Sequence, residues 1–233
     1  METKKVIVFD GDSICHATSE REHRGGGWAM RVGEALGMQW YNVGISGATV
    51  TAELYGASGA PRHWVSRSID KIRKDFPKLD YLILEGGTND ADNLGIGSAL
   101  FGRFDPLDFS GVYDDTTYTG ALESLFYKAI TYYPTAKIGY IVAQKMGCES
   151  VQLVRRRYYF DRAVEVCKKW GVPYLDLWES CPLNPLLDVY YMRDRSVDDN
   201  HVENRAYADG QHLTSHGYDL ISGRIAKWVA SLG

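Results

Sequence analysis

The sequence of 233 residues has few cysteines, no excess of basic charge and no long hydrophobic run. Its four cysteines form no CxxC pair and no zinc-ligand spacing, so we expect reduced and mostly buried thiols, although spacing alone leaves a disulfide open. The net charge of −4 gives no electrostatic footprint for nucleic acid. We interpret the one dense basic run, Arg155-Arg156-Arg157, as a solvated or salt-bridged face of a helix.

Targeting and membrane signals are also missing. The apolar stretch in METKKVIVFD ends at Asp10 after four residues, which is too short for a secretory signal. No later run approaches the length of a membrane span. We therefore expect a cytoplasmic protein that binds neither membranes nor nucleic acid, although a secreted protein without its leader would have the same sequence. The sequence does not determine the oligomeric state.

The hydrophobic pattern indicates an α/β fold, because short β-branched runs alternate with longer helical patterns. We expect strands at 4–9, 38–43, 79–84, 136–142 and 172–177. We expect helices near 28–36, 61–75, 119–133, 151–170 and 215–231. Such an alternation predicts a parallel sheet with helices on both faces, in which ligands bind at the carboxyl ends of the strands.

The length favours one domain, 1–233. Two stretches, 91–118 and 178–208, interrupt the alternation after strands on the presumed active side. Long irregular segments in a compact domain are usually functional loops, so we expect these insertions to form the walls of a substrate pocket. Surface decoration is the simpler alternative.

Two chemistries could begin where the first strand ends, in Asp10-Gly11-Asp12-Ser13. Asp10 and Asp12 are spaced as in the magnesium-dependent haloacid-dehalogenase-like phosphatases, whose first aspartate is the nucleophile. Ile14 stands where that family has threonine or valine, and only Lys145 could serve as its downstream lysine. Ser13 would instead need a histidine that removes its hydroxyl proton.

The segment DGQHLTSHG supplies such a histidine, because Asp209 precedes His212 by three residues just before the last helix. An acid so placed can bond Nδ1 of the imidazole and leave Nε2 facing a nucleophile. His216, the nearest rival, lies within the start of the helix and is expected to point elsewhere. Two further loops offer donors for a developing oxyanion: Gly47 in NVGISGAT and Asn89 in EGGTND.

These four blocks, in this order, resemble the SGNH, or GDSL-type, hydrolase superfamily of esterases and lipases. Gly11-Asp12-Ser13-Ile14 has isoleucine in place of the usual leucine, and Gly47 follows Asn42 by the five residues of the family pattern. Gly87-Thr88-Asn89-Asp90 and Asp209-Gly210-Gln211-His212 match the other two blocks, and the match spans 6–217. The resemblance implies a flavodoxin-like three-layer αβα sandwich with a five-stranded parallel sheet of order 2-1-3-4-5.

By the same resemblance Ser13 is the nucleophile, His212 is the general base and then the general acid, and Asp209 orients His212. The resemblance also implies an oxyanion hole of three donors: the backbone N–H groups of Ser13 and Gly47 and the side chain of Asn89. No metal or cofactor is required. Asp12 and Asp90 are expected to hold their loops through bonds to backbone amides.

The substrate is less well defined by the sequence. Aromatic residues crowd the two insertions: Phe101, Phe104, Phe109, Tyr113, Tyr190 and Tyr191. Aromatic walls suit sugar rings and short acyl chains, but the simpler role of such residues is packing. We expect a small carboxylic ester, with O-acetylated carbohydrate first and a lysophospholipid or thioester second. A non-catalytic carbohydrate-binding protein on the same fold is the alternative, because a fold does not guarantee activity.

Overall fold

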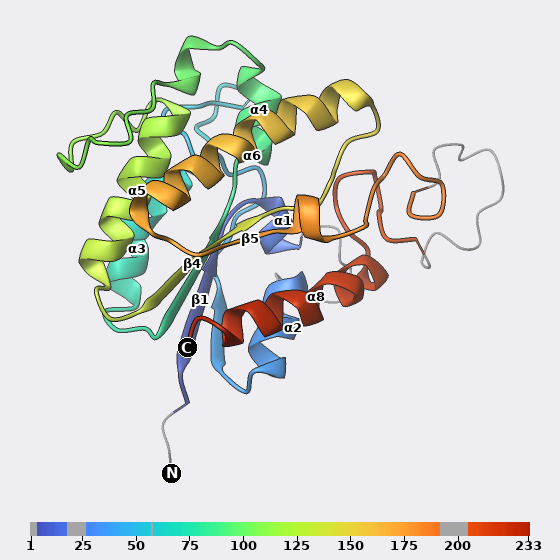
Figure 1. Ribbon diagram of the computed structural model, residues 1–233, viewed down its shortest axis with the longest axis horizontal. Helices are drawn as coiled ribbons and strands as arrows, with labels where there is room; N and C mark the ends of the chain where they lie inside the picture. Colours follow the sequence, from blue (N-terminus) through green and yellow to red (C-terminus); the bar gives the residue numbers. More distant parts are fainter. Residues whose placement is uncertain (1–3, 18–26, 57, 192–204) are drawn as a thin grey trace.

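One parallel sheet organises the computed structural model, which describes residues 4–17, 27–56, 58–191 and 205–233. Its strands lie in the order β2-β1-β3-β4-β5 (Figure 1). They are β1 (Val6–Asp10), β2 (Gln39–Asn42), β3 (Tyr81–Glu85), β4 (Lys137–Val142) and β5 (Tyr174–Asp176). The predicted parallel sheet and its order are confirmed.

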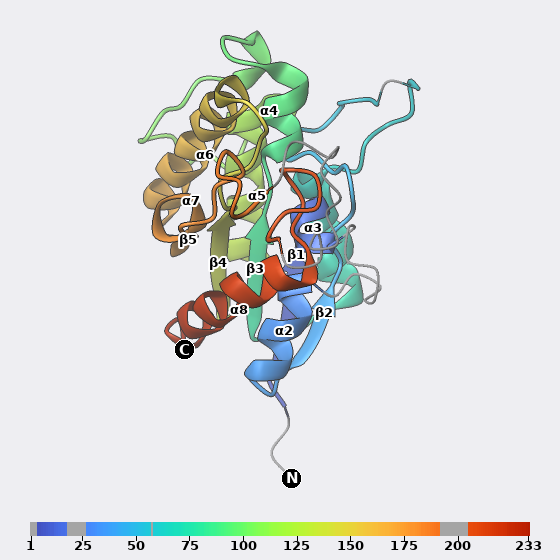
Figure 2. The ribbon, with the colours of Figure 1, turned by 90° about the vertical axis from the view of Figure 1, so that its right-hand side faces the viewer.

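Helices cover both faces of the sheet, which gives three layers (Figures 1 and 2). On one face α2 (Gly27–Ala35) packs against α8 (Ser215–Ala230). On the other, α5 (Tyr118–Tyr132) lies between α3 (Val65–Asp75) and α6 (Ser150–Trp170). The five long helices that the sequence predicted are all present.

The two cores follow from the alternation of side chains along the strands. In β1, Val8 belongs to the core beneath α3, α5 and α6, whereas Ile7 and Phe9 belong to the core beneath α2 and α8. In β3, Leu82 and Ile83 divide between the cores in the same way. Because both faces are covered, these strands are apolar up to their last residue, an acid in each, rather than alternating with polar residues.

Short helices that the sequence did not predict follow the carboxyl ends of three strands. They are α1 (Ser13–His16) after β1, α4 (Thr88–Leu94) after β3 and α7 (Leu177–Ser180) after β5. A 3₁₀ turn, η1 (Ala99–Phe101), follows α4. With seven residues or fewer, these helices are too short to show a helical hydrophobic period.

The first insertion, 91–118, contains the end of α4 and η1. Within the second, 178–208, residues 192–204 lie outside the described residues.

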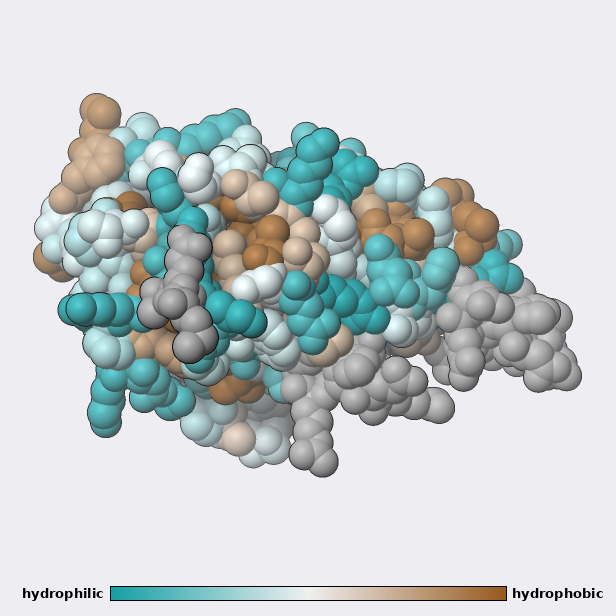
Figure 3. Space-filling view, turned by 90° about the horizontal axis from the view of Figure 1, so that it is seen from below, coloured by the Kyte–Doolittle hydropathy of each residue, from teal (hydrophilic) through white to brown (hydrophobic). Residues whose placement is uncertain are grey.

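All four cysteines are free and three of them are buried. No helix in the described ranges is long and apolar enough to cross a membrane. The end of the molecule at which the strands begin presents apolar and polar side chains side by side (Figure 3).

Candidate active site

Ser13 lies directly beyond the carboxyl end of β1, as the first residue of α1. The N-cap is Asp12, whose Oδ1 accepts a 2.9 Å hydrogen bond from the backbone N–H of Ile14. The chain can turn here because Gly11 has no side chain: a Cβ on Gly11 would lie 2.6 Å from Oε2 of Glu85. The Ser13 residue is only 3% exposed. Asp12 therefore has the structural role expected of it.

His212 reaches Ser13 from a tight loop, although 199 positions separate the two residues in the chain. Nε2 of His212 lies 2.8 Å from Oγ of Ser13, and Nδ1 lies 2.7 Å from Oδ2 of Asp209. The loop is closed by a hydrogen bond of 2.9 Å from the backbone N–H of Ala208 to the carbonyl oxygen of His212. The structure thus joins acid, imidazole and hydroxyl in series.

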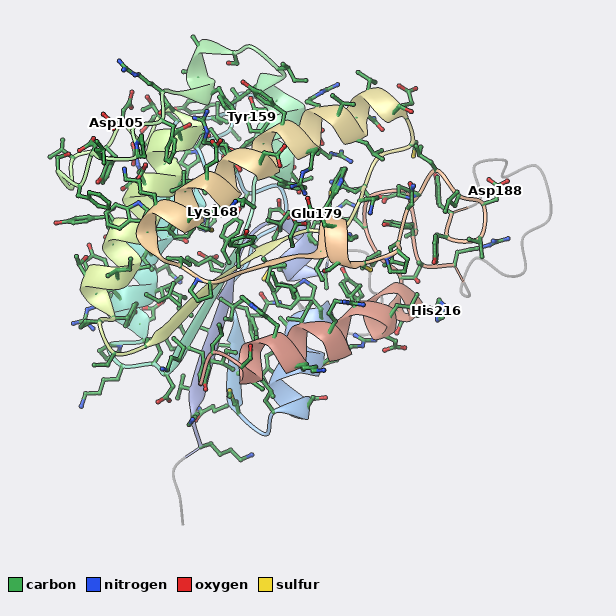
Figure 4. The ribbon with its side chains drawn as sticks, in the orientation of Figure 1. Asp105, Tyr159, Lys168, Glu179, Asp188 and His216 are labelled. Carbon is green, nitrogen blue, oxygen red and sulfur yellow. The ribbon has the colours of Figure 1, made fainter. Side chains whose placement is uncertain are left out.

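Asp209 also holds its own loop in shape. Its Oδ1 accepts backbone N–H bonds from Gln211 at 2.9 Å and from His212 at 2.7 Å. Thr214 then caps α8 by accepting from the backbone N–H of Gly217. The rival His216 is exposed at the start of α8 (Figure 4). The carboxylate that orients the imidazole therefore also fixes the backbone from which the imidazole extends.

The ionisation of this pair suits a general base. Burial opposes the charge on Asp209, but the hydrogen bonds from His212 and Gln211 outweigh it and lower the pKa of Asp209 to about 2. Burial likewise favours neutral His212, yet the bond to Asp209 and the charges of Asp209 and Asp12 raise the pKa of His212 above 6.5. Asp209 thus stays ionised, and a carboxylate bonded to Nδ1 favours the charged form of the imidazole.

Asn89 is tied to the loop that carries Gly47. Its Nδ2 donates a 2.8 Å hydrogen bond to the carbonyl oxygen of Ala48, and an amide nitrogen carries two hydrogens that it can donate. Gly47 has φ = 77°, a conformation that favours glycine. The two candidate oxyanion donors therefore belong to one bonded unit.

This loop is also fixed to neighbouring segments. The side chain of Asp90 accepts bonds of 2.9 and 2.8 Å from the backbone N–H groups of Val50 and Thr51, which confirms its expected loop-holding role. The backbone N–H of Ile45 donates to the carbonyl oxygen of Gly11 at 3.0 Å. The Gly47 loop is thereby joined to the segment that begins at the end of β1 and leads into Ser13.

Glu85, at the end of β3, was not singled out from the sequence. It is 1% exposed, its Oε2 accepts from the backbone N–H of Asp12 at 3.2 Å, and the two carboxyl groups bond to each other. Burial, and then the charge of Asp12, raise the pKa of Glu85 well above 4.5. Burial raises the pKa of Asp12 as well, so the two buried carboxyl groups share a proton more readily than two exposed acids would. An acid that ends a wholly apolar strand is the sequence signal for Glu85.

Asp10, the other candidate nucleophile, is fully buried. Its carboxyl group bonds to the hydroxyl of Ser68 on α3 and accepts from the backbone N–H of Gly11 at 3.0 Å. Within the described ranges, no three His, Cys, Asp or Glu side chains are grouped so that they could hold a metal ion. The structure does not present Asp10 to a substrate, so the position of Asp10 gives no support to the phosphatase hypothesis.

Arg156 was also missed. The sequence placed it on a solvated or salt-bridged helix face, but its side chain is only 3% exposed, so the solvated reading is wrong for this residue. The salt-bridged reading is confirmed, because Nη2 of Arg156 lies 2.8 Å from Oδ2 of Asp92. The same nitrogen donates to Oε1 of Gln211 at 2.7 Å, next to His212. A basic run alone gives no signal for such burial.

Four of the six insertion aromatics pack against helices. The ring of Phe101 stacks on Tyr158 at 4.3 Å, and Phe109 and Tyr113 contact Trp170 at the end of α6. Phe104 lies under the guanidinium of Arg162. The simpler packing role is confirmed for these four residues. Tyr190 and Tyr191 are partly buried against the core beneath α2 and α8. The ring of Tyr191 also lies beside the His212 loop, because a Cβ placed on Gly210 would be 3.3 Å from it.

Solved structures resemble the whole chain in fold. A Lactobacillus plantarum protein is 19% identical with a TM-score of 0.71, covering 99% of each chain. A carbohydrate acetylesterase from Sinorhizobium meliloti is 16% identical with a TM-score of 0.63, covering 99% of this chain and 100% of that one. The M. smegmatis aryl esterase is 18% identical with a TM-score of 0.63, covering 98% and 100%. No curated protein sequence matches the chain.

The family comparison extends from the β1 end through the His212 loop. The model of the GDSL-like lipase/acylhydrolase family matches residues 9–220, which include all four sequence blocks. A match over so much of the chain shows its family. The protein belongs to the GDSL-like lipase/acylhydrolase family, whose members are hydrolases that act on esters.

Proposed function

We propose that the protein is a serine esterase that hydrolyses small carboxylic esters through an acyl-enzyme on Ser13. The observation that carries the proposal is the continuous series from Asp209 through His212 to Oγ of Ser13, with contacts of 2.7 and 2.8 Å. A serine hydroxyl becomes nucleophilic when a base within hydrogen-bond reach accepts its proton. A binding module has no need of this arrangement.

In the first half-reaction, Oγ of Ser13 attacks the ester carbonyl carbon while its proton passes to Nε2 of His212. The carbonyl oxygen becomes negative and is stabilised by the N–H groups of Ser13 and Gly47 and by the amide of Asn89. The carbon–oxygen bond to the alcohol then breaks. The alcohol leaves with the proton from His212, and the acyl group remains on Ser13.

The second half-reaction repeats these steps with water. His212 removes a proton from water as the oxygen attacks the acyl carbon, and the same donors stabilise the second oxyanion. The bond to Oγ of Ser13 breaks, the serine recovers its proton from His212, and the carboxylic acid leaves. No metal enters either step.

For the substrate we favour short acyl esters, with O-acetylated carbohydrate first. Tyr191 is the aromatic residue that best supports a sugar-binding wall, because it is only partly buried and its ring lies beside Gly210 in the His212 loop. The likeness in fold to a carbohydrate acetylesterase and an aryl esterase agrees with this choice but does not choose between them.

The test is hydrolysis by the purified protein of p-nitrophenyl esters of increasing acyl length and of a panel of O-acetylated sugars, with and without EDTA. We expect EDTA-insensitive turnover that is fastest for acetyl esters. Binding of sugars without hydrolysis would favour the carbohydrate-binding alternative. Turnover that requires added magnesium and acts on phosphate monoesters would favour the phosphatase.

A further inference from the structure

Arg156 lies in the first third of α6 and connects two parts of the candidate active site. Its Nη2 donates to Oδ2 of Asp92 at 2.8 Å and to Oε1 of Gln211 at 2.7 Å. Asp92 belongs to α4, the helix whose first turn carries Asn89. Gln211 directly precedes His212. One nitrogen of Arg156 thus bonds at the same time to α4, which carries Asn89, and to the loop 209–212, which carries His212.

Neighbouring contacts make α6 a fixed support for this connection. The hydroxyl of Tyr159, on the same helix (Figure 4), donates to the carbonyl oxygen of Gly95 just beyond α4, at 2.7 Å. The backbone N–H of Gln211 donates to Oδ1 of Asp209 at 2.9 Å. Gln211 therefore bonds to Arg156 through its side chain and to Asp209 through its backbone, and so links α6 to the Asp209–His212 pair.

Fold stability alone is a poor explanation for this arginine. Nε and Nη1 of Arg156 are buried and have no hydrogen-bond partner within the described ranges. Unused buried donors cost stability and call for an explanation in each case. Asp92 is 34% exposed, so removing Arg156 would leave no buried unpaired charge behind.

Arg156 also acts on His212 through its charge. Among the described residues, three charged side chains act on the imidazole: Asp209 in the same loop, Asp12 before α1, and Arg156 on α6. Glu85 on β3 faces Asp12, and burial raises the pKa of both acids. Burial and the two aspartates dominate the pKa of His212, which is raised, and Arg156 opposes that rise.

We propose that Arg156 is a positioning residue that fixes the loop 209–212 relative to α4, and so keeps His212 and Asn89 aligned around Ser13. This inference rests on the proposed esterase mechanism. Misplacing a catalytic group by about 1 Å can reduce turnover by about 10²-fold. The arginine therefore affects the rate without touching the reacting atoms.

The experiment compares Arg156→Met, Arg156→Lys and the matched control Arg157→Met. Arg157 is the next residue on α6, and its ion pairs to Asp176 and Glu179 lie outside the site. For each variant, kcat and KM for p-nitrophenyl acetate are measured from pH 5 to 9 together with Tm. Gln211→Met removes the amide that accepts from Arg156 but keeps the arginine, so it tests the effect on kcat alone if Arg156→Met does not fold.

For Arg156→Met we expect kcat to fall by about 10- to 10²-fold with KM changed less than about 3-fold. The rising limb of the pH profile should move to higher pH, because a positive charge that favoured neutral His212 is lost. Arg156→Lys should keep the limb near its wild-type position and recover part of kcat. Arg157→Met should change neither kcat nor the limb.

Wild-type kcat and an unmoved pH limb in a folded Arg156→Met variant, or wild-type kcat in a folded Gln211→Met variant, would overturn the inference. So would a loss of Tm in Arg156→Met with no loss of kcat. In both cases the wild-type enzyme is active and the proposed function stands. A wild-type protein that hydrolyses no ester would instead remove the proposed function, and this inference with it.

Discussion

Asp10 and Asp209 are two carboxylates near the same serine, and their surroundings are opposite. Asp10 ends β1, three residues before Ser13, and is fully buried. The side chain of Asp209 is 48% exposed on a loop and reaches Ser13 only through His212. Burial raises the pKa of Asp10 to about 7, whereas the bonds from His212 and Gln211 overcome burial and lower that of Asp209 to about 2.

The hydrogen bonds of Asp10 agree with a bound proton. The hydroxyl of Ser68 lies against both Asp10 and the carbonyl oxygen of Val65, but it has a single hydrogen to donate. If Asp10 is protonated, its O–H donates to Ser68 while Ser68 donates to Val65. Nearness to the nucleophile in the sequence therefore says little about function, because the partners of each acid determine its role.

The largest expected effect is the loss of turnover in Ser13→Ala. No other group in the series can form the acyl-enzyme, so ester hydrolysis should fall by about 10⁴-fold or more, to the background of the assay. Circular dichroism and Tm should stay close to wild type, because the change removes a single oxygen atom. Full activity in Ser13→Ala would assign the nucleophile to another residue.

Asp209→Ala should cost roughly 10⁴-fold in kcat, since the imidazole loses the carboxylate that orients it and stabilises its charged form. His212 must be neutral to accept a proton, so wild-type activity should rise with pH through its raised pKa. Without Asp209 the pKa of His212 should fall, and the rise of activity with pH should move to lower pH. A pH profile of kcat/KM measures both effects, and a limb that stays in place would contradict the pairing.

Asn89→Ala should lower kcat by about 10²- to 10³-fold with little change in KM. A donor aimed at the developing negative charge stabilises the transition state more than the neutral ester. Measuring kcat, KM and Tm together separates this role from loop closure. Undiminished kcat in a folded variant would remove Asn89 from the site, and a loss confined to Tm would leave it only the bond to Ala48.

Asp10→Asn should have the smallest effect on activity and a measurable one on stability. Burial raises the pKa of Asp10 from 3.8 to about 7 on folding. Between these two pH values the folded protein holds a proton on Asp10 that the unfolded chain has lost. The contribution of Asp10 to the free energy of unfolding is therefore fully present below about pH 4. It falls as the pH rises towards 7, by up to about 1.4 kcal/mol per pH unit.

The neutral amide in Asp10→Asn removes this dependence. Urea unfolding at pH 5 and pH 7 should show that the wild-type protein loses more free energy of unfolding between the two values than the variant does, while kcat stays close to wild type. Equal losses in the two proteins would indicate that Asp10 is ionised when folded. If Asp10→Asn lost as much activity as Ser13→Ala, Asp10 would have a catalytic role and not the structural role described here.

The sequence predicted the long elements well because the helices show a helical period and the buried strands are short apolar runs. Strands expected at 79–84 and 136–142 are Tyr81–Glu85 and Lys137–Val142. The helix expected from 61 begins only at Val65, because Pro61 and Trp64 instead form isolated bridges to Tyr55 and Thr49. Isolated bridges of this kind leave no periodic pattern in the sequence.

At the candidate active site too, the sequence predicted only the residues that belong to a local motif. Local motifs indicated Ser13 and the Asp209–His212 loop, because their spacing carries the geometry. Glu85 and Arg156 act through partners that are far away in the chain, 73 positions for Asp12 and 55 for Gln211. No local pattern records that proximity, so only the folded structure brings these two residues into the account.

The most direct test of the account is the position of a covalent adduct. A fluorophosphonate should form a bond from phosphorus to Oγ of Ser13 as fluoride leaves and His212 takes the proton, and peptide mass spectrometry locates the adduct. We predict an adduct at Ser13 in the wild-type protein and in Asp10→Asn, and none in Ser13→Ala. An adduct on another serine, or labelling that disappears in a folded Asp10→Asn variant, would contradict the central claim.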